Sequence, residues 1–263
     1  MPKIAITGKG GVGKTTLAAL LAHIYTGAGH PVIAIDADPA ASLAYALGMP
    51  DELAAQVVPI AEMEDLIYER TGAKPGTTGG FFKLNPRVDD IPDRFSVLHR
   101  GIRLLQLGTI STGGSGCICP ESAVLKTLVT HVVLYRNEVM ILDMEAGVEH
   151  LGRATASAVD AFVIVVEPGR RSLATAQTIQ RLAADIGVAH CYVVGNKVRD
   201  EADRDFVRSS LPNLQVIGFL SAHPDAVAAD MRGEAIFDAV PELVQEARQV
   251  AVAFDKELAA EVT

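Results

Sequence analysis

Short apolar runs alternate along this chain with longer stretches in which apolar residues recur at helical spacing. Each run is apolar almost throughout, which is typical of a strand buried on both faces of a sheet. Strands that alternate with helices predict an α/β fold, with a mostly parallel sheet and helices on both faces. The predicted strands span residues 3–7, 32–36, 139–144, 161–166, 191–196 and 215–220.

Helical periodicity is clearest in two stretches, residues 173–186 and residues 243–258. The least regular stretch is 73–94, which we expect to be a long loop packed down by Phe81 and Phe82. The chain contains no internal repeat and no linker that would divide it. We therefore expect a single domain over its whole length, residues 1–263.

The composition narrows the possible partners. The formal net charge is -9 and no run of basic residues occurs, which argues against binding to nucleic acid. The longest apolar run is too short to cross a membrane, and the last predicted helix is too acidic to lie on one. The first residues do not form a signal peptide, and three cysteines do not make a disulfide framework. We therefore expect a cytoplasmic protein.

The stretch GKGGVGKTT, residues 8–16, fits two nucleotide-binding templates and is called the phosphate loop below. The dinucleotide pattern G-x-G-x-x-G is matched by Gly8, Gly10 and Gly13, and Asp36 and Asp38 lie roughly where its ribose-binding acid would be. The pattern G-x-x-x-x-G-K-[ST] is matched by Gly8 and Gly13 and also uses Lys14 and Thr15. A lysine at the positive end of a helix is unfavourable unless an anion lies between them, and a threonine hydroxyl is a ligand for Mg²⁺. The second template is favoured. It predicts that a triphosphate and Mg²⁺ are bound by Gly10, Gly11, Val12, Gly13, Lys14, Thr15 and Thr16.

Residues 9–16 of the loop begin with Lys9 and read KGGVGKTT. This stretch resembles the deviant Walker A motif of the MinD/ParA/nitrogenase-iron-protein group of dimerising ATPases. The resemblance implies a P-loop ATPase domain of the SIMIBI type. It also implies that Lys9 reaches the phosphates of a dimer partner, although a role within its own subunit stays open. Further roles implied by the resemblance are water orientation for Asp38, metal binding for Asp36 and Asp143, and recognition of adenine for Asn196.

The stretch after Asp143 matches the group less well. Gly147 is expected to give a flexible switch II segment. Glu145, in contrast, stands where members of the group tend to carry a small residue or proline. This departure places a second carboxylate close to Asp143 in the sequence.

Cys117 and Cys119 form a C-x-C motif, which places both thiols on one side of an extended segment. Two thiolates are half of a closed zinc site or of a planar nickel site. A two-fold dimer would bring the same motif from each subunit to one axis and complete the set. Cys191 begins a predicted buried strand and is expected to pack in the core. The alternative, two ordinary thiols in a turn, stays open.

Several stretches narrow the resemblance to the CooC family, the nickel-insertion accessory ATPases of carbon monoxide dehydrogenase. They are GKGGVGKTT, GGSGCICPE, LDMEAGVEHLGR, VVEP, NKVR and LNPRVDDIPD. The resemblance implies an Mg-ATP-dependent homodimer that binds Ni²⁺ or Zn²⁺ through Cys117 and Cys119 and assists a carbon monoxide dehydrogenase apoenzyme. Two alternatives are a spatial regulator of the MinD/ParA type and a dimer bridged by an iron–sulfur cluster.

Overall fold

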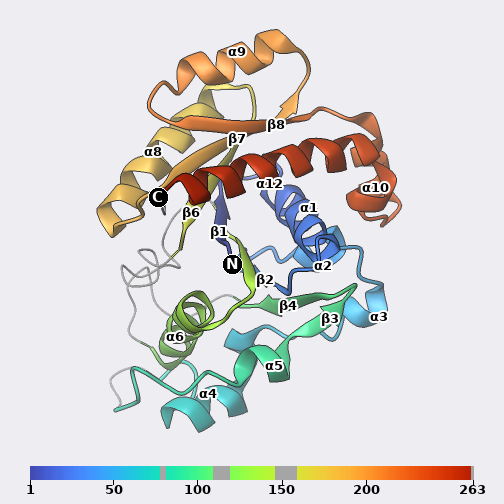
Figure 1. The fold of residues 1–263 in the computed structure, drawn as a ribbon. Coiled ribbons are helices and arrows are strands. Elements are labelled where there is room, and N and C mark those ends of the chain that lie inside the picture. Colours follow the sequence, from blue (N-terminus) through green and yellow to red (C-terminus); the bar gives the residue numbers. More distant parts are fainter. Residues whose placement is uncertain (78–80, 109–118, 146–158, 262–263) are drawn as a thin grey trace.

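The strands form one sheet in which the central strands are all parallel (Figure 1). The computed structural model describes residues 1–77, 81–108, 119–145 and 159–261. Within these residues the strand order is β3-β4-β2-β5-β1-β6-β7-β8, and only β3 and β4 pair antiparallel. The strands are β1 (Lys3–Thr7), β2 (Val32–Asp36), β3 (Val97–His99), β4 (Ile102–Gln106), β5 (Val139–Asp143), β6 (Ala161–Val166), β7 (Cys191–Val198) and β8 (Gln215–Ser221).

Helices cover both faces of the sheet, so the predicted fold class is confirmed. Among the described helices, none has the length and apolar character needed to span a membrane. The helices are α1 (Lys14–Gly27), α2 (Leu43–Ala46), α3 (Asp51–Ala54), α4 (Glu64–Thr71), α5 (Ile91–Phe95), α6 (Pro120–Tyr135), α8 (Arg170–Ile186), α9 (Glu201–Ser210), α10 (Pro224–Met231), α11 (Ile236–Ala239) and α12 (Pro241–Glu261), with a 3₁₀ turn η1 (Ile60–Glu62).

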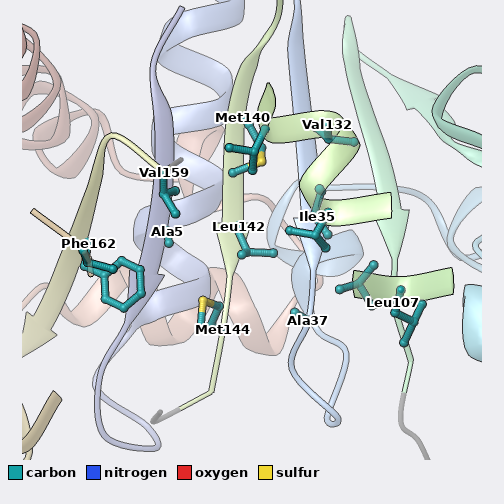
Figure 2. Packing of buried hydrophobic residues seen from close by; sticks show 14 of the residues in the cluster. Ala5, Ile35, Ala37, Leu107, Val132, Met140, Leu142, Met144, Val159 and Phe162 are labelled. Carbon is teal, nitrogen blue, oxygen red and sulfur yellow. The ribbon is translucent and has the colours of Figure 1, made fainter. Parts of the chain in front are cut away.

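The core has two layers because successive strand residues point to opposite faces of the sheet. Ile4 and Ile6 of β1 pack with α1 and α12, whereas Ala5 packs on the other face with α6 and α8. Figure 2 shows part of this second layer, in which Leu142 of β5 belongs to the same cluster as Ile35 of β2 and Val132 of α6. Burial on both faces explains why the central strands read as continuous apolar runs.

The predicted strands are all present, with small differences at their ends: β5 ends at Asp143, β7 extends to Val198 and β8 to Ser221. The edge strand β3 and its neighbour β4 were not predicted. Leu98 of β3 is 63% exposed and β4 contains Arg103, so neither strand is the apolar run that marks a strand buried on both faces.

Residues 81–90 contain no helix or strand, as expected for the long loop, but Ile91–Phe95 forms α5. The prediction that Phe81 packs this segment down is wrong, because its side chain is fully exposed. Val88 and Ile91 are buried in its place and join the core layer on the α6 side of the sheet. Aliphatic residues therefore hold this segment against the sheet.

The buried side chain of Lys3 caps the carboxyl end of α6. Its Nζ atom donates hydrogen bonds to the carbonyl oxygens of Val132, Arg136 and Glu138 at 3.3, 2.7 and 2.9 Å. Carbonyl groups at the end of a helix have no partner within the helix, so a buried ammonium group is an effective substitute for water. Burial lowers the pKa of Lys3, and the carboxylate of Glu138 opposes this shift.

Replacing Lys3 by methionine is expected to lower the free energy of unfolding by about 2–4 kcal/mol, because three carbonyl groups that are buried or partly buried lose their donor. Urea denaturation should show a lower midpoint with an unchanged slope. Lys126→Met, an exposed lysine on α6, is the matched control and should change stability by less than about 0.5 kcal/mol. Equal stabilities for the two variants would contradict the structural role of Lys3.

Candidate nucleotide site

The candidate site lies where β1, β2 and β5 end beside the start of α1. β1 ends at Thr7 and α1 begins at Lys14, so the phosphate loop joins the end of a central strand to the first turn of a helix. β2 and β5 are neighbours, and their last residues, Asp36 and Asp143, are register partners. Because parallel strands end at the same edge of a sheet, the loop and both carboxylates lie at one edge.

Two glycines of the loop are required by close contacts. A Cβ atom on Gly8 would lie 2.4 Å from the carbonyl oxygen of Val165, and one on Gly13 would lie 2.1 Å from Nδ2 of Asn196. Gly13 also has a φ of 96°, in the left-handed region that favours glycine. Nothing lies within 4 Å of a Cβ atom on Gly10, the middle glycine of the dinucleotide template. The contacts thus support the phosphate-loop template.

Side chains of β7 hold the backbone of the loop. Nδ2 of Asn196 donates to the carbonyl oxygen of Val12 at 2.7 Å, and Nζ of Lys197 donates to that of Gly11 at 2.6 Å. In a planar trans peptide the N–H points away from the C=O, so the N–H of Gly13 is directed away from Asn196. No side chain caps the start of α1, and its first turn contains no acid. The helix start therefore offers N–H groups to an anion.

The carboxylates of Asp36 and Asp143 are both buried but are satisfied differently. Asp36 accepts hydrogen bonds from the backbone N–H groups of Asp38 and Leu43 at 3.1 and 3.0 Å. Among the described residues, none donates a hydrogen bond of regular geometry to either carboxylate oxygen of the fully buried Asp143. A buried carboxylate in this state is costly unless it is protonated or meets a cation.

Burial raises the pKa of Asp143 to about 7, while the nearby hydroxyl of Thr15 and the ammonium group of Lys14 act against the rise. Lys14 is only 6% exposed, and its Nζ lies 3.9 Å from Oδ2 of Asp38. One buried cation thus lies among several acids, and the site carries an excess of negative charge. Carboxylate and hydroxyl oxygens are ligands that Mg²⁺ prefers, and Mg²⁺ keeps several waters and substrate phosphates as its other ligands. These residues therefore fit Mg²⁺ bound with a nucleotide.

Lys9 pairs with a carboxylate that follows β6. Its Nζ lies 3.7 Å from Oε1 of Glu167, and Nζ of Lys197 lies 3.9 Å from Oε2 of the same residue. Neither Glu167 nor Lys197 has a role predicted from the sequence, although both belong to stretches that carry the family resemblance. Their signal in the sequence is a charged side chain at the carboxyl end of a buried strand that borders the phosphate loop.

The cysteines occupy different parts of the fold. Cys119 is buried directly before α6, and Cys117 lies outside the described residues, as does Gly147. Cys191 is the first residue of β7, so it lies at the amino ends of the parallel strands, whereas the phosphate loop lies at their carboxyl ends. Burial raises the pKa of Cys191 to about 11. Where the structure describes side chains, no three or more His, Cys, Asp and Glu are grouped to hold a metal ion. Metal binding by Cys117 and Cys119 stays a prediction.

Comparison with known proteins identifies a family for this chain. The family model described as the CobQ/CobB/MinD/ParA nucleotide binding domain matches residues 3–236. The carbon monoxide dehydrogenase accessory protein CooC of Rhodospirillum rubrum is 47% identical over 239 residues, which cover 91% of this chain and 90% of that protein. An uncharacterized ATP-binding protein of Methanocaldococcus jannaschii is 46% identical over 237 residues, 89% of this chain and 90% of that protein.

Solved structures agree on the fold. The MinD cell division protein of Aquifex aeolicus superposes with a TM-score of 0.68 at 21% identity, covering 97% of this chain and 98% of that one. A ParA family ATPase from Chlorobium tepidum gives a TM-score of 0.67 at 15% identity, covering 96% and 98%. At these identities the likeness establishes the architecture alone.

Proposed function

Because the chain belongs to the CobQ/CobB/MinD/ParA nucleotide-binding family and is a relative of CooC, we propose that it is a dimerising Mg-ATPase that assists nickel insertion into carbon monoxide dehydrogenase. The observation that carries the ATPase part is the buried carboxylate of Asp143, which lacks a regular hydrogen bond from the described residues. It lies at the sheet edge beside Lys14 and the uncapped start of α1. Mg²⁺ with a nucleotide would satisfy this carboxylate and neutralise the site.

Each part of the nucleotide has a proposed set of ligands. The backbone N–H groups of the loop and the ammonium of Lys14 would bind phosphate oxygens, as at other helix starts that receive anions. Bound Mg²⁺ would neutralise charge on the phosphates. Asp38, on the segment after β2, would orient the attacking water, and Lys9 would stabilise charge on the phosphates of a dimer partner. The full proposed set is Gly10, Gly11, Val12, Gly13, Lys14, Thr15, Thr16, Asp36, Asp143 and Asn196, with Lys9 and Asp38 in hydrolysis.

Asn196 keeps the capacity to read an adenine ring. Its Nδ2 uses one hydrogen on Val12, and its Oδ1 accepts from the N–H of Lys197 at 2.8 Å. An amide side chain has a second hydrogen and a second lone pair, which are what an adenine edge requires. We propose that Asn196 both fixes the phosphate loop and contacts the base.

The cargo site is proposed at a dimer axis. Cys117 and Cys119 from each subunit would give the four sulfur ligands that Ni²⁺ or Zn²⁺ accepts. α6, which begins right after Cys119, is tied to the 73–77 segment, because Glu121 in its first turn accepts a hydrogen bond from the N–H of Gly76 at 2.6 Å. The carbon monoxide dehydrogenase apoenzyme is the proposed recipient, on the strength of the name of the relative.

The test of this function is the mass of the particle in solution by light scattering. With Ni²⁺ or Zn²⁺ the wild-type chain should form a dimer that binds about half an equivalent of metal per chain. A variant with Cys117→Ser and Cys119→Ser should stay monomeric with metal and bind it more than about tenfold more weakly. Cys191→Ser is the matched control, because that thiol lies at the opposite edge of the sheet and should leave the dimer intact.

Two results would contradict the cargo site. Unchanged metal affinity in the Cys117→Ser, Cys119→Ser variant would exclude these thiols as ligands. A broad brown absorption band in protein isolated without oxygen would instead favour an iron–sulfur cluster between the subunits.

A further inference from the structure

Glu167 lies between two lysines of the nucleotide site. Its Oε1 is 3.7 Å from Nζ of Lys9, and its Oε2 is 3.9 Å from Nζ of Lys197. Within the described part of the chain, Glu167 is the carboxylate that pairs with Lys9. Lys9 is the residue that the proposed function assigns to the partner's phosphates, yet here it is held by its own subunit. We call the Lys9–Glu167 contact the cis pair.

The backbone of Glu167 is fixed beside the phosphate loop. Its N–H donates to the hydroxyl of Ser172 at 3.0 Å, and its carbonyl oxygen accepts from the N–H of Gly169 at 2.7 Å. Two residues earlier, the carbonyl of Val165 is so close to Gly8 that only glycine fits there. The carboxylate therefore projects from a rigid strand end, whereas Lys9 sits on a loop.

Lys197 keeps the carboxylate partnered when Lys9 leaves. Its Nζ is anchored on the carbonyl oxygen of Gly11 at 2.6 Å, and its backbone has a φ of 57°, which is uncommon for a residue other than glycine. Such strain persists where surrounding contacts fix the residue. Because a second cation stays beside Glu167, breaking the cis pair does not leave an isolated charge, and its cost is kept low.

We propose that Glu167 holds Lys9 in its own subunit before dimerisation. The free energy of the cis pair then opposes the ATP-dependent association of two chains. This rests on the proposed function, in which Lys9 acts across the dimer. The side chains of Lys9 and Glu167 are 39% and 34% exposed, and an ion pair of that kind changes an equilibrium by about threefold. Since a two-fold dimer breaks two cis pairs, the effect on the dimer dissociation constant is squared, to about tenfold.

The decisive variant is Glu167→Gln, which removes the charge but keeps the shape and both backbone hydrogen bonds. Dimer dissociation constants are measured by analytical ultracentrifugation with Mg²⁺, with and without a non-hydrolysable ATP analogue, and with Ni²⁺ present so that dimers stay measurable in every variant. Lys9→Met and the double variant Glu167→Gln, Lys9→Met complete a cycle. Asp238→Asn is the control, because it removes an exposed ion pair with Arg100 in a different part of the chain.

We expect the analogue to tighten the Glu167→Gln dimer about tenfold more than the wild-type dimer, and Glu167→Gln to have no effect once Lys9 is methionine. The Asp238→Asn variant should behave as wild type. If the analogue tightens the wild-type dimer and tightens the Glu167→Gln dimer equally or less, the role of the cis pair is overturned and the proposed function stands. If Glu167→Gln also tightens the analogue-bound dimer equally when Lys9 is methionine, the role of the cis pair is likewise overturned. If the analogue does not tighten even the wild-type dimer, the proposed function fails and the cis pair fails with it.

Discussion

Replacing Lys14 by methionine is expected to lower kcat for ATP hydrolysis by at least about 10³-fold, while the affinity of the thiol site for Ni²⁺ stays within about twofold. The ammonium of Lys14 is buried at the start of α1, with its Nζ 3.9 Å from Asp38. Charge stabilisation by a fixed, water-excluded cation is worth far more than the same contact in water. Methionine keeps the volume and removes the charge.

The same substitution changes the protein before any nucleotide binds. Lys14 opposes the rise in the pKa of Asp143, so its loss leaves the acids of the site without their buried cation. Binding of a triphosphate should therefore weaken for two reasons, a missing ligand and a more negative site. Phosphate release measures hydrolysis, calorimetry measures nucleotide affinity, and thiolate-to-metal absorption measures Ni²⁺ binding.

Lys9→Met is the informative comparison, because it removes a lysine from the same loop. It should lower hydrolysis through the dimer while a single subunit still binds nucleotide. Hydrolysis by Lys14→Met within about tenfold of wild type would contradict the phosphate-binding role of this residue. A parallel loss of Ni²⁺ binding would show that the two sites do not fold independently.

The elements of the core could be predicted from the sequence because each central strand is buried on both faces. The stretch AFVIVV became β6 with the predicted ends. The edge strand β3 could not, since Leu98 is exposed and three residues of antiparallel pairing leave no periodic signal. Sequence patterns report burial, and a strand as short and as exposed as β3 does not produce one.

One part of the candidate site could also be predicted from the sequence, and another part could not. That Asp36 and Asp143 would meet follows from parallel strands ending at one edge, and the register confirms that they are neighbours. The contact of Lys197 with Gly11 joins residues 186 positions apart, and no local pattern encodes it. It depends on β7 lying two strands from β1 in the sheet, which only the topology shows.

Replacing Asp143 by asparagine is expected to change how the stability of the nucleotide-free protein depends on pH. Burial raises the pKa of this carboxyl from 3.8 to about 7. A carboxyl whose pKa is raised on folding binds its proton more tightly in the folded state, so stability falls as pH rises from about 4 to 7 and stays low above that range. The penalty approaches about 4 kcal/mol at alkaline pH and is only about 2 kcal/mol at pH 5.

Asparagine cannot ionise, so the variant should lose this pH dependence. Relative to wild type, its free energy of unfolding should therefore rise by about 2–3 kcal/mol between pH 5 and pH 8, whatever constant offset the new amide introduces. Urea denaturation without nucleotide at several pH values measures the difference.

The same carboxyl should release a proton when Mg²⁺ and ATP bind near pH 7, because a cation favours its charged form. Calorimetry in buffers of different ionisation enthalpy would detect this proton in wild type and not in Asp143→Asn. The variant should also gain little thermal stability from Mg-ATP, whereas wild type should gain several degrees. A stability difference that is flat with pH, together with equal proton release in both proteins, would show that Asp143 is already charged and partnered before the nucleotide arrives. In that case the buried carboxylate would not be the feature that makes this edge of the sheet a magnesium site.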